Sequence, residues 1–340
     1  MSAPLLSVEN LNVSFATPDG VVRAVTDVSF RINTGETLGI VGESGSGKSV
    51  TASSILRLNN SVTATTSGRV LFDGNDVLTV DESEMRRIRG QEIAMVFQDP
   101  LSALNPFYTV GEQIAEAYLV HHPKATKSDV RSRVLEMLEK VGIPNPSKRI
   151  DEYPHEFSGG MRQRIVIAIA LINSPRLLIA DEPTTALDVT VQAQILDLMK
   201  DLQQETGMAI ILITHDLGVV AEVADSALVM YGGRVVERAD VMSIFSVPTH
   251  PYSWGLLGAV GSLDTSSRGH LATIPGTPPS LISLPNGCAF RPRCAHQEGD
   301  ESRCAHDVPV LRTIEGTSSE SACHLADSQL VSIGQRSARS

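Results

Sequence analysis

The chain has 340 residues, 42% of them hydrophobic and 20% charged, which excludes disorder of the whole chain and corresponds in length to about two domains. Asp and Glu outnumber Lys and Arg by 39 to 28, and the net charge of −11 gives the chain no overall electrostatic reason to bind nucleic acid or anionic lipid. The longest apolar run has eight residues, 165–172, and the N-terminal sequence has no basic start, so we expect no membrane span, no signal peptide and a cytosolic chain.

Strands are expected throughout the N-terminal third. Their predicted ranges are 6–15, 21–32, 38–41, 67–73 and 93–97. The turn signal Pro18-Asp19-Gly20 separates the first two. The third is a short apolar strand that leads into glycines, and a helix is expected to follow from Lys48 to Leu58.

The pattern between Thr109 and Gly142 indicates one short helical insertion, with Ser128 as the expected N-cap. Its apolar face would consist of Val130, Val134, Met137, Leu138 and Val141. Further strands are predicted at 177–180, 210–213 and 227–229. Buried strands that alternate with helices predict an α/β core around a mostly parallel sheet. From about Pro248, repeated prolines predict a separate, loop-rich tail.

Residues 42–49, Gly-Glu-Ser-Gly-Ser-Gly-Lys-Ser, match the pattern of a phosphate-binding P-loop between a strand and a helix. The glycines let backbone N–H groups turn toward phosphate oxygens, and the helix N-terminus adds positive potential. Lys48 is expected to reach the β and γ phosphates of a nucleotide, and the Ser49 hydroxyl to bind Mg²⁺. A chance match is the alternative for the motif alone.

A second motif consists of four apolar residues, 177–180, followed by Asp181 and Glu182. A buried strand would deliver Asp181 to a position where it can hold hydrated Mg²⁺, and Glu182 to one where it can polarise an attacking water. Taken alone, a strand that ends in two acids is more often the start of a solvated loop. The P-loop earlier in the chain favours the functional interpretation.

A third motif, Ser158-Gly159-Gly160-Met161-Arg162-Gln163, precedes a predicted helix at 161–172. It resembles the signature loop, Ser-Gly-Gly-x-x-Gln, of the ATPase subunits of ABC transporters. In that family the backbone N–H groups and Ser hydroxyl of this loop bind the γ-phosphate of an ATP that the other subunit's P-loop holds. A glycine turn that caps a helix is the alternative for the motif alone.

The resemblance covers about residues 5–260 and assigns roles to isolated positions. It implies that Phe15 stacks on adenine and that His215 contacts the γ-phosphate. It also implies that Gln98 senses Mg²⁺ and the γ-phosphate and links to the membrane subunit, and that Asp188 lies in a loop that crosses between subunits. Without the resemblance, these four would be interpreted as a core Phe, a surface Gln, a helix N-cap and a capping or surface His.

The positions that the resemblance implies fall into three sets. The nucleotide-binding positions are Phe15, Gly42, Glu43, Ser44, Gly45, Ser46, Gly47, Lys48, Ser49, Val50, Gln98, Ser158, Gly159, Gly160, Gln163, Asp181, Asp188 and His215. The catalytic positions are Glu182, His215 and Gln98. The Mg²⁺ positions are Ser49, Gln98 and Asp181.

The loop 97–106, Phe-Gln-Asp-Pro-Leu-Ser-Ala-Leu-Asn-Pro, and the tail motifs 249–252, 276–281 and 287–294 resemble those of dipeptide and oligopeptide importers. The implied fold is an α/β, P-loop ABC-type ATPase core with a mostly parallel sheet, an antiparallel β subdomain and a helical subdomain, followed by a loop-rich C-terminal cysteine extension. The expected domains are an ATPase domain at 1–260, with its helical subdomain at about 102–165, and the cysteine extension at 261–340.

All four cysteines, Cys288, Cys294, Cys304 and Cys323, lie in the last 53 residues, separated by gaps of five, nine and eighteen residues. Four thiolates satisfy the ligand count of a [4Fe–4S] cluster or of tetrahedral zinc. The absence of paired Cys-x2-Cys knuckles is unfavourable for a zinc site. However, His296, His306 and His324 are nearby and could replace a cysteine ligand, so zinc is still an alternative. Four free thiols in a flexible tail are a further alternative, and the resemblance to the importer branch favours the [4Fe–4S] cluster.

The resemblance implies an ATP-hydrolysing subunit that energises import of dipeptides or oligopeptides with Mg²⁺ as cofactor. The implied partners are a second ABC ATPase subunit, in a heterodimer rather than a homodimer, two integral membrane permease subunits and, indirectly, an extracytoplasmic substrate-binding protein. The chain would then lie on the cytoplasmic face of the inner membrane. An ABC-type ATPase acting on nucleic acid is the alternative, which the acidic charge and the short insertion between Ser49 and Ser158 disfavour. A P-loop kinase or GTPase would lack the signature loop.

Overall fold

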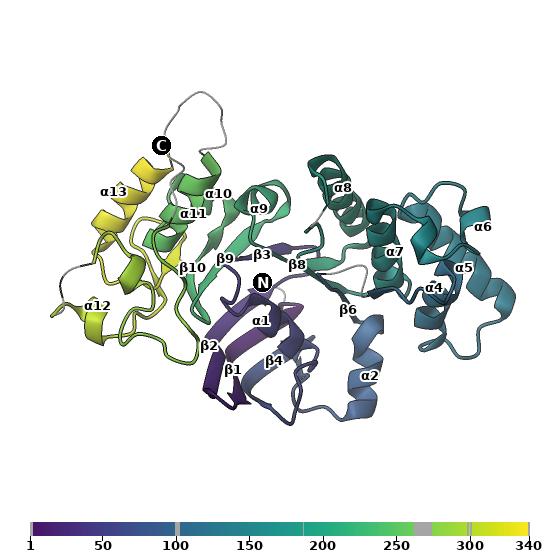
Figure 1. The fold of residues 1–340 in the computed structure, drawn as a ribbon, viewed down its shortest axis with the longest axis horizontal. Helices are drawn as coiled ribbons and strands as arrows, with labels where there is room; N and C mark the ends of the chain where they lie inside the picture. Colours follow the sequence, from purple (N-terminus) through teal and green to yellow (C-terminus); the bar gives the residue numbers. More distant parts are fainter. Residues whose placement is uncertain are drawn as a thin grey trace. The chain divides into compact units, whose positions relative to one another are not determined.

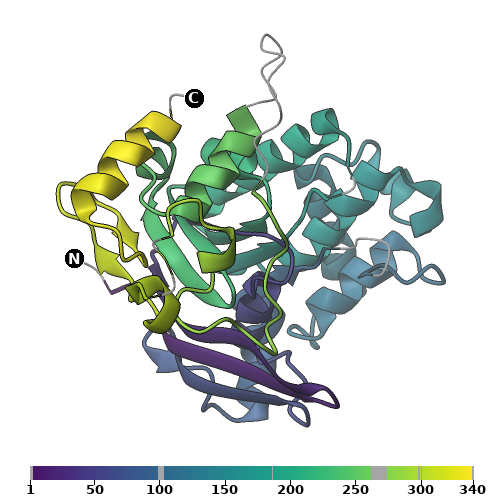
Figure 2. The ribbon, with the colours of Figure 1, turned by 60° about the vertical axis from the view of Figure 1, so that its left-hand side comes forward.

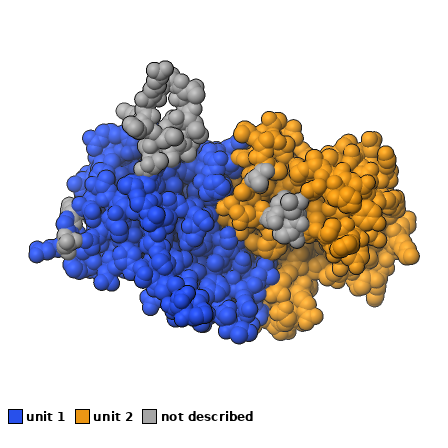
Figure 3. All heavy atoms as spheres, in the orientation of Figure 1, with its two compact units in different colours: residues 1–32, 37–78, 214–340 blue, residues 33–36, 79–213 orange. Residues whose placement is uncertain are grey.

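The computed structural model describes residues 3–98, 103–185, 187–261, 274–297, 299 and 301–338. The chain divides into two compact units, which Figure 3 shows in different colours. Unit 1 contains residues 1–32, 37–78 and 214–340, and unit 2 contains residues 33–36 and 79–213. Each unit is described by itself below, with the element labels of Figure 1.

Unit 1 contains an antiparallel sheet with the strand order β2-β1-β4-β5 (Figure 1). Its strands are β1 (Leu6–Thr17), β2 (Gly20–Ile32), β4 (Ala64–Phe72) and β5 (Asn75–Asp76). Leu6, Val8, Leu11 and Val13 of β1 are buried, with a register irregularity between Val8 and Leu11, as expected for a sheet with one face against a core.

The rest of unit 1 is built on a second set of strands. β3 (Thr37–Val41) runs parallel to β9 (Ser226–Tyr231), and β10 (Arg234–Asp240) is antiparallel to β9. The short strands β12 (Glu320–Ser321) and β11 (Arg312–Thr313) continue this sheet from β10. The helices of the unit are α1 (Lys48–Ile55), α9 (Leu217–Val223), α10 (Val241–Ser246), α11 (Pro251–Gly261), α12 (Arg303–His306) and α13 (Asp327–Ser337), with a 3₁₀ turn η2 at Arg291–Arg293.

Unit 2 has a parallel sheet of β6 (Ile93–Val96), β7 (Leu177–Asp181) and β8 (Ala209–Thr214). Every residue of β7 and β8 is buried, which explains why both strands are continuous apolar runs up to their last residues, Asp181 and Thr214, rather than alternating. The helices are α2 (Glu82–Gln91), α4 (Val110–Leu119), α5 (Lys127–Lys140), α6 (Pro146–Arg149), α7 (Gly159–Leu171) and α8 (Val189–Thr206), with a 3₁₀ turn η1 at Pro154–Glu156.

The structure confirms the α/β class and the predicted strands, but it corrects three local predictions. Helix α1 ends at Ile55, not at Leu58. The N-cap of α5 is Thr126, not Ser128, because the Thr126 hydroxyl accepts the Asp129 N–H at 3.2 Å. The single helical insertion expected before Ser158 comprises α4, α5 and α6.

The predicted loop-rich tail contains more regular structure than its prolines suggest (Figure 2). Helix α11 begins directly at Pro251, a residue that the first helical turn accepts because it needs no N–H donor there. Helix α13 packs against α11. The tail is also not separate: β12 pairs with β10, and residues up to 340 belong to the unit that contains the P-loop.

In the part of the chain that the structure describes, no helix is long and apolar enough to cross a membrane.

Candidate nucleotide-binding site

The P-loop motif connects β3 to α1 in unit 1, and its glycines are required by close backbone contacts. A Cβ atom on Gly42 would lie 2.3 Å from the Met230 carbonyl oxygen. Gly47 has φ +102°, and a Cβ atom there would lie 2.4 Å from the Ala24 carbonyl oxygen. The motif therefore forms the tight strand-to-helix turn that the sequence predicts.

Two buried polar groups lie at this turn. The Lys48 side chain is buried, and its Nζ donates to the carbonyl oxygens of Gly42 at 2.7 Å and Glu43 at 3.0 Å. The Ser46 hydroxyl is buried and has no hydrogen-bond partner among the described residues. Together with the N-terminus of α1, a desolvated ammonium and an unpaired hydroxyl form an arrangement suited to an anion such as phosphate. Ser49, the next residue, is exposed in the first turn of α1.

The other predicted nucleotide contacts of unit 1 lie on different elements. Phe15 is half-buried on β1, where it pairs with Val22 of β2 and Ala64 of β4. His215 is exposed directly after the last residue of β8, Thr214.

In unit 2 the structure brings Glu182 and Gln98 together. Asp181 is the buried last residue of β7. Glu182 follows with φ +47°, and its N–H donates to the Ile213 carbonyl at 2.9 Å. Its Oε2 accepts hydrogen bonds from Gln98 Nε2 and from the Thr185 hydroxyl, both at 2.9 Å. Thr185 was not a predicted site residue, and only its position three residues after Glu182 could have suggested it.

The signature loop begins α7 in unit 2. The Ser158 hydroxyl accepts the Met161 N–H at 3.4 Å and is the N-cap of α7. Asp188 is likewise the N-cap of α8, because it accepts the Val191 N–H at 3.0 Å. Both amide atoms of Gln163 are buried without a hydrogen-bond partner among the described residues. Residues 99–102 of the predicted importer loop and Ala186 before Asp188 lie outside the described residues.

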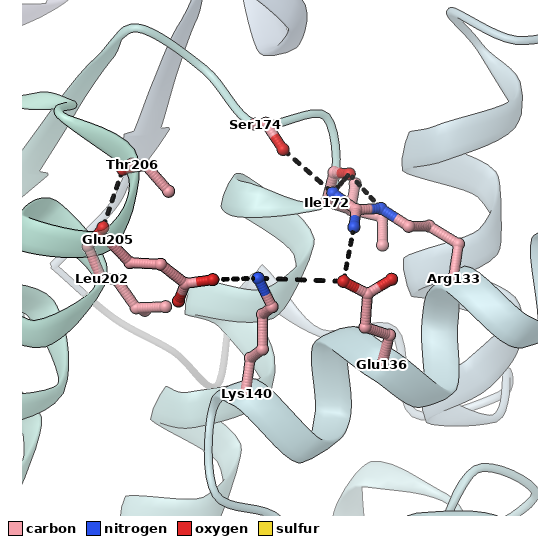
Figure 4. Close-up of polar contacts among 8 residues, drawn as sticks. All are labelled: Arg133, Glu136, Lys140, Ile172, Ser174, Leu202, Glu205 and Thr206. Carbon is pink, nitrogen blue, oxygen red and sulfur yellow. Dashed lines mark hydrogen bonds and ion pairs between the residues drawn. The ribbon is translucent and has the colours of Figure 1, made fainter.

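The C-terminal end of α7 is held by α5, as Figure 4 shows. The Arg133 guanidinium donates from Nε and Nη2 to the Ile172 carbonyl, at 3.2 and 3.1 Å, and from Nη2 to the Ser174 hydroxyl at 2.9 Å. Lys140 bridges Glu136 and Glu205 at 3.8 and 2.6 Å, which connects α5 to α8. The Arg133 contacts therefore fix the C-terminal end of the helix that begins at the signature loop.

Comparisons with known proteins decide the family. Residues 25–185 match the ABC transporter family, and residues 236–300 match the C-terminal region of oligopeptide/dipeptide transporters. The dipeptide transport ATP-binding protein DppD of Bacillus subtilis (strain 168) is 56% identical over 86% of this chain and 87% of its own length. The oligopeptide transport ATP-binding protein OppD of Salmonella typhimurium is 52% identical over 86% of each chain. The chain belongs to the ABC transporter ATPases.

Solved structures of ABC ATPases have the same fold. CbiO1 of Clostridium perfringens, part of the ABC transporter complex CbiONQ, has a TM-score of 0.62 and 31% identity, and covers 72% of this chain and 91% of its own. The ATP-binding cassette MJ0796, solved as a dimer bound to ADP and Pi, has a TM-score of 0.62 and 29% identity over 69% of this chain and 98% of its own.

The four cysteines of this ABC ATPase are all reduced and half-buried in unit 1. The Cys288 N–H donates to the Cys304 carbonyl at 2.9 Å, which joins the first and third cysteine segments. Burial, with a smaller contribution from neighbouring thiols, raises the pKa of Cys294 to about 11 and that of Cys323 to about 12. Within the described ranges, no three His, Cys, Asp or Glu side chains are arranged to hold a metal ion. The predicted [4Fe–4S] cluster is therefore not supported by this arrangement.

Proposed function

We propose that this ABC ATPase hydrolyses ATP to power the import of dipeptides or oligopeptides, through Gln98, Glu182 and the P-loop residues. Two features support the proposal. The C-terminal match is to oligopeptide/dipeptide transporters, a region that lies outside the general ABC match. The relatives at 50–56% identity include proteins named for dipeptide, oligopeptide and peptide import.

The geometry of Glu182 is the observation that carries the catalytic assignment. A general base must be held within reach of the water that it activates. Glu182 follows a buried strand, and two donors, Gln98 and Thr185, fix one of its carboxylate oxygens at 2.9 Å each. We propose that the carboxylate held in this way accepts the proton of the water.

Binding of the nucleotide is assigned to the P-loop. Lys48 and Ser46 would contact phosphate oxygens, with backbone N–H groups of residues 44, 45 and 47–50, and Phe15 would stack on adenine. The Glu43 N–H, which the sequence placed in this set, donates instead to the Tyr252 hydroxyl. Ser49, Asp181 and Gln98 would hold Mg²⁺, which neutralises phosphate charge when bound. His215 is proposed to contact the γ-phosphate, and Ser158, Gly159, Gly160, Gln163 and Asp188 to act on an ATP held by another subunit.

The proposed assembly contains a second ATPase, which we expect to be a different chain, two integral membrane permease subunits, and indirectly a binding protein. This chain would lie on the cytoplasmic face of the inner membrane. The dimeric state of the related cassette MJ0796 supports pairing of ATPase subunits. We retain the division into an ATPase domain at 1–260, with a helical part at 102–165, and a cysteine extension at 261–340 as part of this proposal.

The cysteine extension is proposed to bind a [4Fe–4S] cluster through Cys288, Cys294, Cys304 and Cys323, with zinc as the alternative. What supports this is that the Cys288 N–H donates to the Cys304 carbonyl at 2.9 Å, which places two of the four cysteine segments side by side. A cluster would be structural and would hold the loops of the tail together.

The substitution Glu182→Gln tests the catalytic assignment. The amide keeps the shape of the side chain but cannot accept a proton, so we expect ATP binding to persist and turnover to fall by about 100-fold or more. The matched control is Glu205→Gln, which removes an exposed carboxylate of the same unit. Steady-state ATP hydrolysis and nucleotide binding are measured on both. Wild-type turnover in Glu182→Gln would contradict the assignment.

A further inference from the structure

A charged contact joins the cysteine-bearing tail to the P-loop. The Arg293 guanidinium, one residue before Cys294, forms two parallel hydrogen bonds with the Glu43 carboxylate, Nη1 to Oε2 at 2.5 Å and Nη2 to Oε1 at 3.0 Å. Only 4% of the Arg293 side chain is exposed, against 30% for that of Glu43. A two-point contact of this kind fixes the orientation of a carboxylate as well as its charge.

Arg293 is itself held firmly in place. Its Nε donates to the Pro275 carbonyl at 2.9 Å, and its guanidinium carbon lies 5.8 Å from the centre of the Tyr231 ring. A guanidinium is always protonated in proteins, so Arg293 brings a permanent positive charge to this contact. The positive charge is therefore positioned before any nucleotide binds.

The backbone of the same P-loop residue is held by a second tail residue. The Glu43 N–H donates to the Tyr252 hydroxyl at 2.8 Å. Tyr252 is fully buried, and its ring centre lies 4.7 Å from that of Tyr231 and 5.5 Å from that of Phe290. The side chain and the backbone of Glu43 are thus both held by residues beyond position 250.

The position of Glu43 makes this contact important for a phosphate site. Lys48 Nζ lies 3.0 Å from the Glu43 carbonyl oxygen, so an uncompensated carboxylate on this residue would be close to the cation that is to bind phosphate. It would attract that cation and repel the nucleotide. We propose that Arg293 is a positioning residue of the ATP site, which neutralises Glu43 and holds its carboxylate away from the phosphates. The inference rests on the proposed function, because it takes residues 42–49 as the ATP site.

Equilibrium binding of Mg²⁺ and the fluorescent analogue mant-ATP to the purified full-length chain tests the proposal. For Arg293→Gln we expect the Kd to rise about tenfold, the effect of one uncompensated charge near the phosphates. The double variant Glu43→Gln/Arg293→Gln should return the Kd to within about threefold of wild type, because it removes the carboxylate that needed compensation. Arg293→Lys should be intermediate, since it keeps the charge but loses the two-point contact.

The control is Arg303→Gln, which removes an exposed arginine next to Cys304 whose ion pair is with Asp307, and we expect no change in its Kd. An unchanged Kd in Arg293→Gln would overturn the inference. So would a double variant that binds as weakly as the single one, because the loss would then come from structural damage and not from charge. The single variant Glu43→Gln leaves Arg293 in place, and weaker binding by it would also contradict the proposal. If wild type fails to bind mant-ATP, the proposed function itself is wrong.

Discussion

The backbone at Glu182 is strained in a way that matches its proposed role. Its φ of +47° lies in the left-handed region, which costs a side chain other than Asn, Asp or Gly about 1 kcal/mol or more. The strain is balanced by hydrogen bonds from its N–H to Ile213 and from Gln98 and Thr185 to its carboxylate. Strained residues that are held by several contacts are typical of catalytic sites.

A second unusual residue is Glu237, which is fully buried before α11. Its Oε1 accepts the N–H and hydroxyl of Thr249 at 2.5 and 2.9 Å, and its Oε2 accepts the His250 N–H at 3.0 Å. Burial raises the pKa of Glu237 from 4.5 to about 7, and burial lowers the pKa of His250 from 6.5 to about 3. The two groups therefore change stability with pH in opposite directions.

The pH dependence of stability tests the raised pKa of Glu237. Its stabilising contribution is complete below its unfolded pKa of 4.5 and is lost as pH rises through its folded pKa of about 7, by about 3 kcal/mol. His250 has the opposite effect, because its stabilising contribution is lost as pH falls below 6.5. The comparison of wild type with Glu237→Gln therefore isolates the effect of Glu237. We expect the Tm of wild type, relative to that of Glu237→Gln, to fall from pH 5 to pH 8. A constant difference would show that the pKa of Glu237 is not raised.

At the scale of elements, the contact between α7 and α8 depends on one glycine. A Cβ atom on Gly160 would lie 2.5 Å from Val191 Cγ1, whereas one on Gly159 would lie 3.9 Å from Leu187 Cδ2, an ordinary contact. Both glycines are in the first turn of α7, so an added methyl group changes helix propensity equally at either position.

These two glycines provide a matched pair of variants. Gly160→Ala should destabilise the protein by about 1–3 kcal/mol more than Gly159→Ala, because α8 must shift to admit the methyl group. Thermal unfolding of the two purified variants measures the difference. Equal Tm values would mean that Val191 rotates away without cost.

Elements with a strong local signal were predictable from the sequence. β3, β7 and β8 are apolar runs between turn residues, and the helix α5 has four buried apolar residues on one face, with Val141 at its C-cap. The start of α5 was misplaced because Ser128 and Thr126 are both good caps, and only the structure shows which hydroxyl accepts the Asp129 N–H. Helix α11 was missed because prolines mark its start, although Pro251 occupies the first helical position, where it is tolerated. Helix α13 was missed because the whole segment after Pro248 was interpreted as loop-rich.

At the scale of the whole chain, the motifs identified the site but not its supporting contacts. The P-loop and the acidic strand end are local patterns, so the sequence shows them directly. The contacts of Glu43 with Arg293 and Tyr252 join positions 250 and 209 residues apart, and no spacing rule predicts them. The tail was expected to be separate, yet its residues pack against Tyr231 and hold the P-loop.

The metal content of the cysteine extension can be measured directly. We expect the full-length chain, purified without oxygen, to be brown and to contain about four iron and four sulfide per chain. Cys323→Ser should remove the colour and leave the mant-ATP Kd measurable as a check on folding. Colourless protein with stoichiometric zinc, or with no metal, would contradict the proposed cluster.

Peptide-dependent ATP hydrolysis by the assembled transporter tests the central claim most directly. The complex is isolated from membranes through a tag on this chain, reconstituted in lipid vesicles with its binding protein, and supplied with Mg²⁺, ATP and labelled dipeptides or oligopeptides. We predict recovery with integral membrane subunits, and peptide uptake that requires ATP and is lost in Glu182→Gln but retained in Glu205→Gln. Recovery with nucleic acid and without membrane subunits, or uptake that persists in Glu182→Gln, would contradict the account.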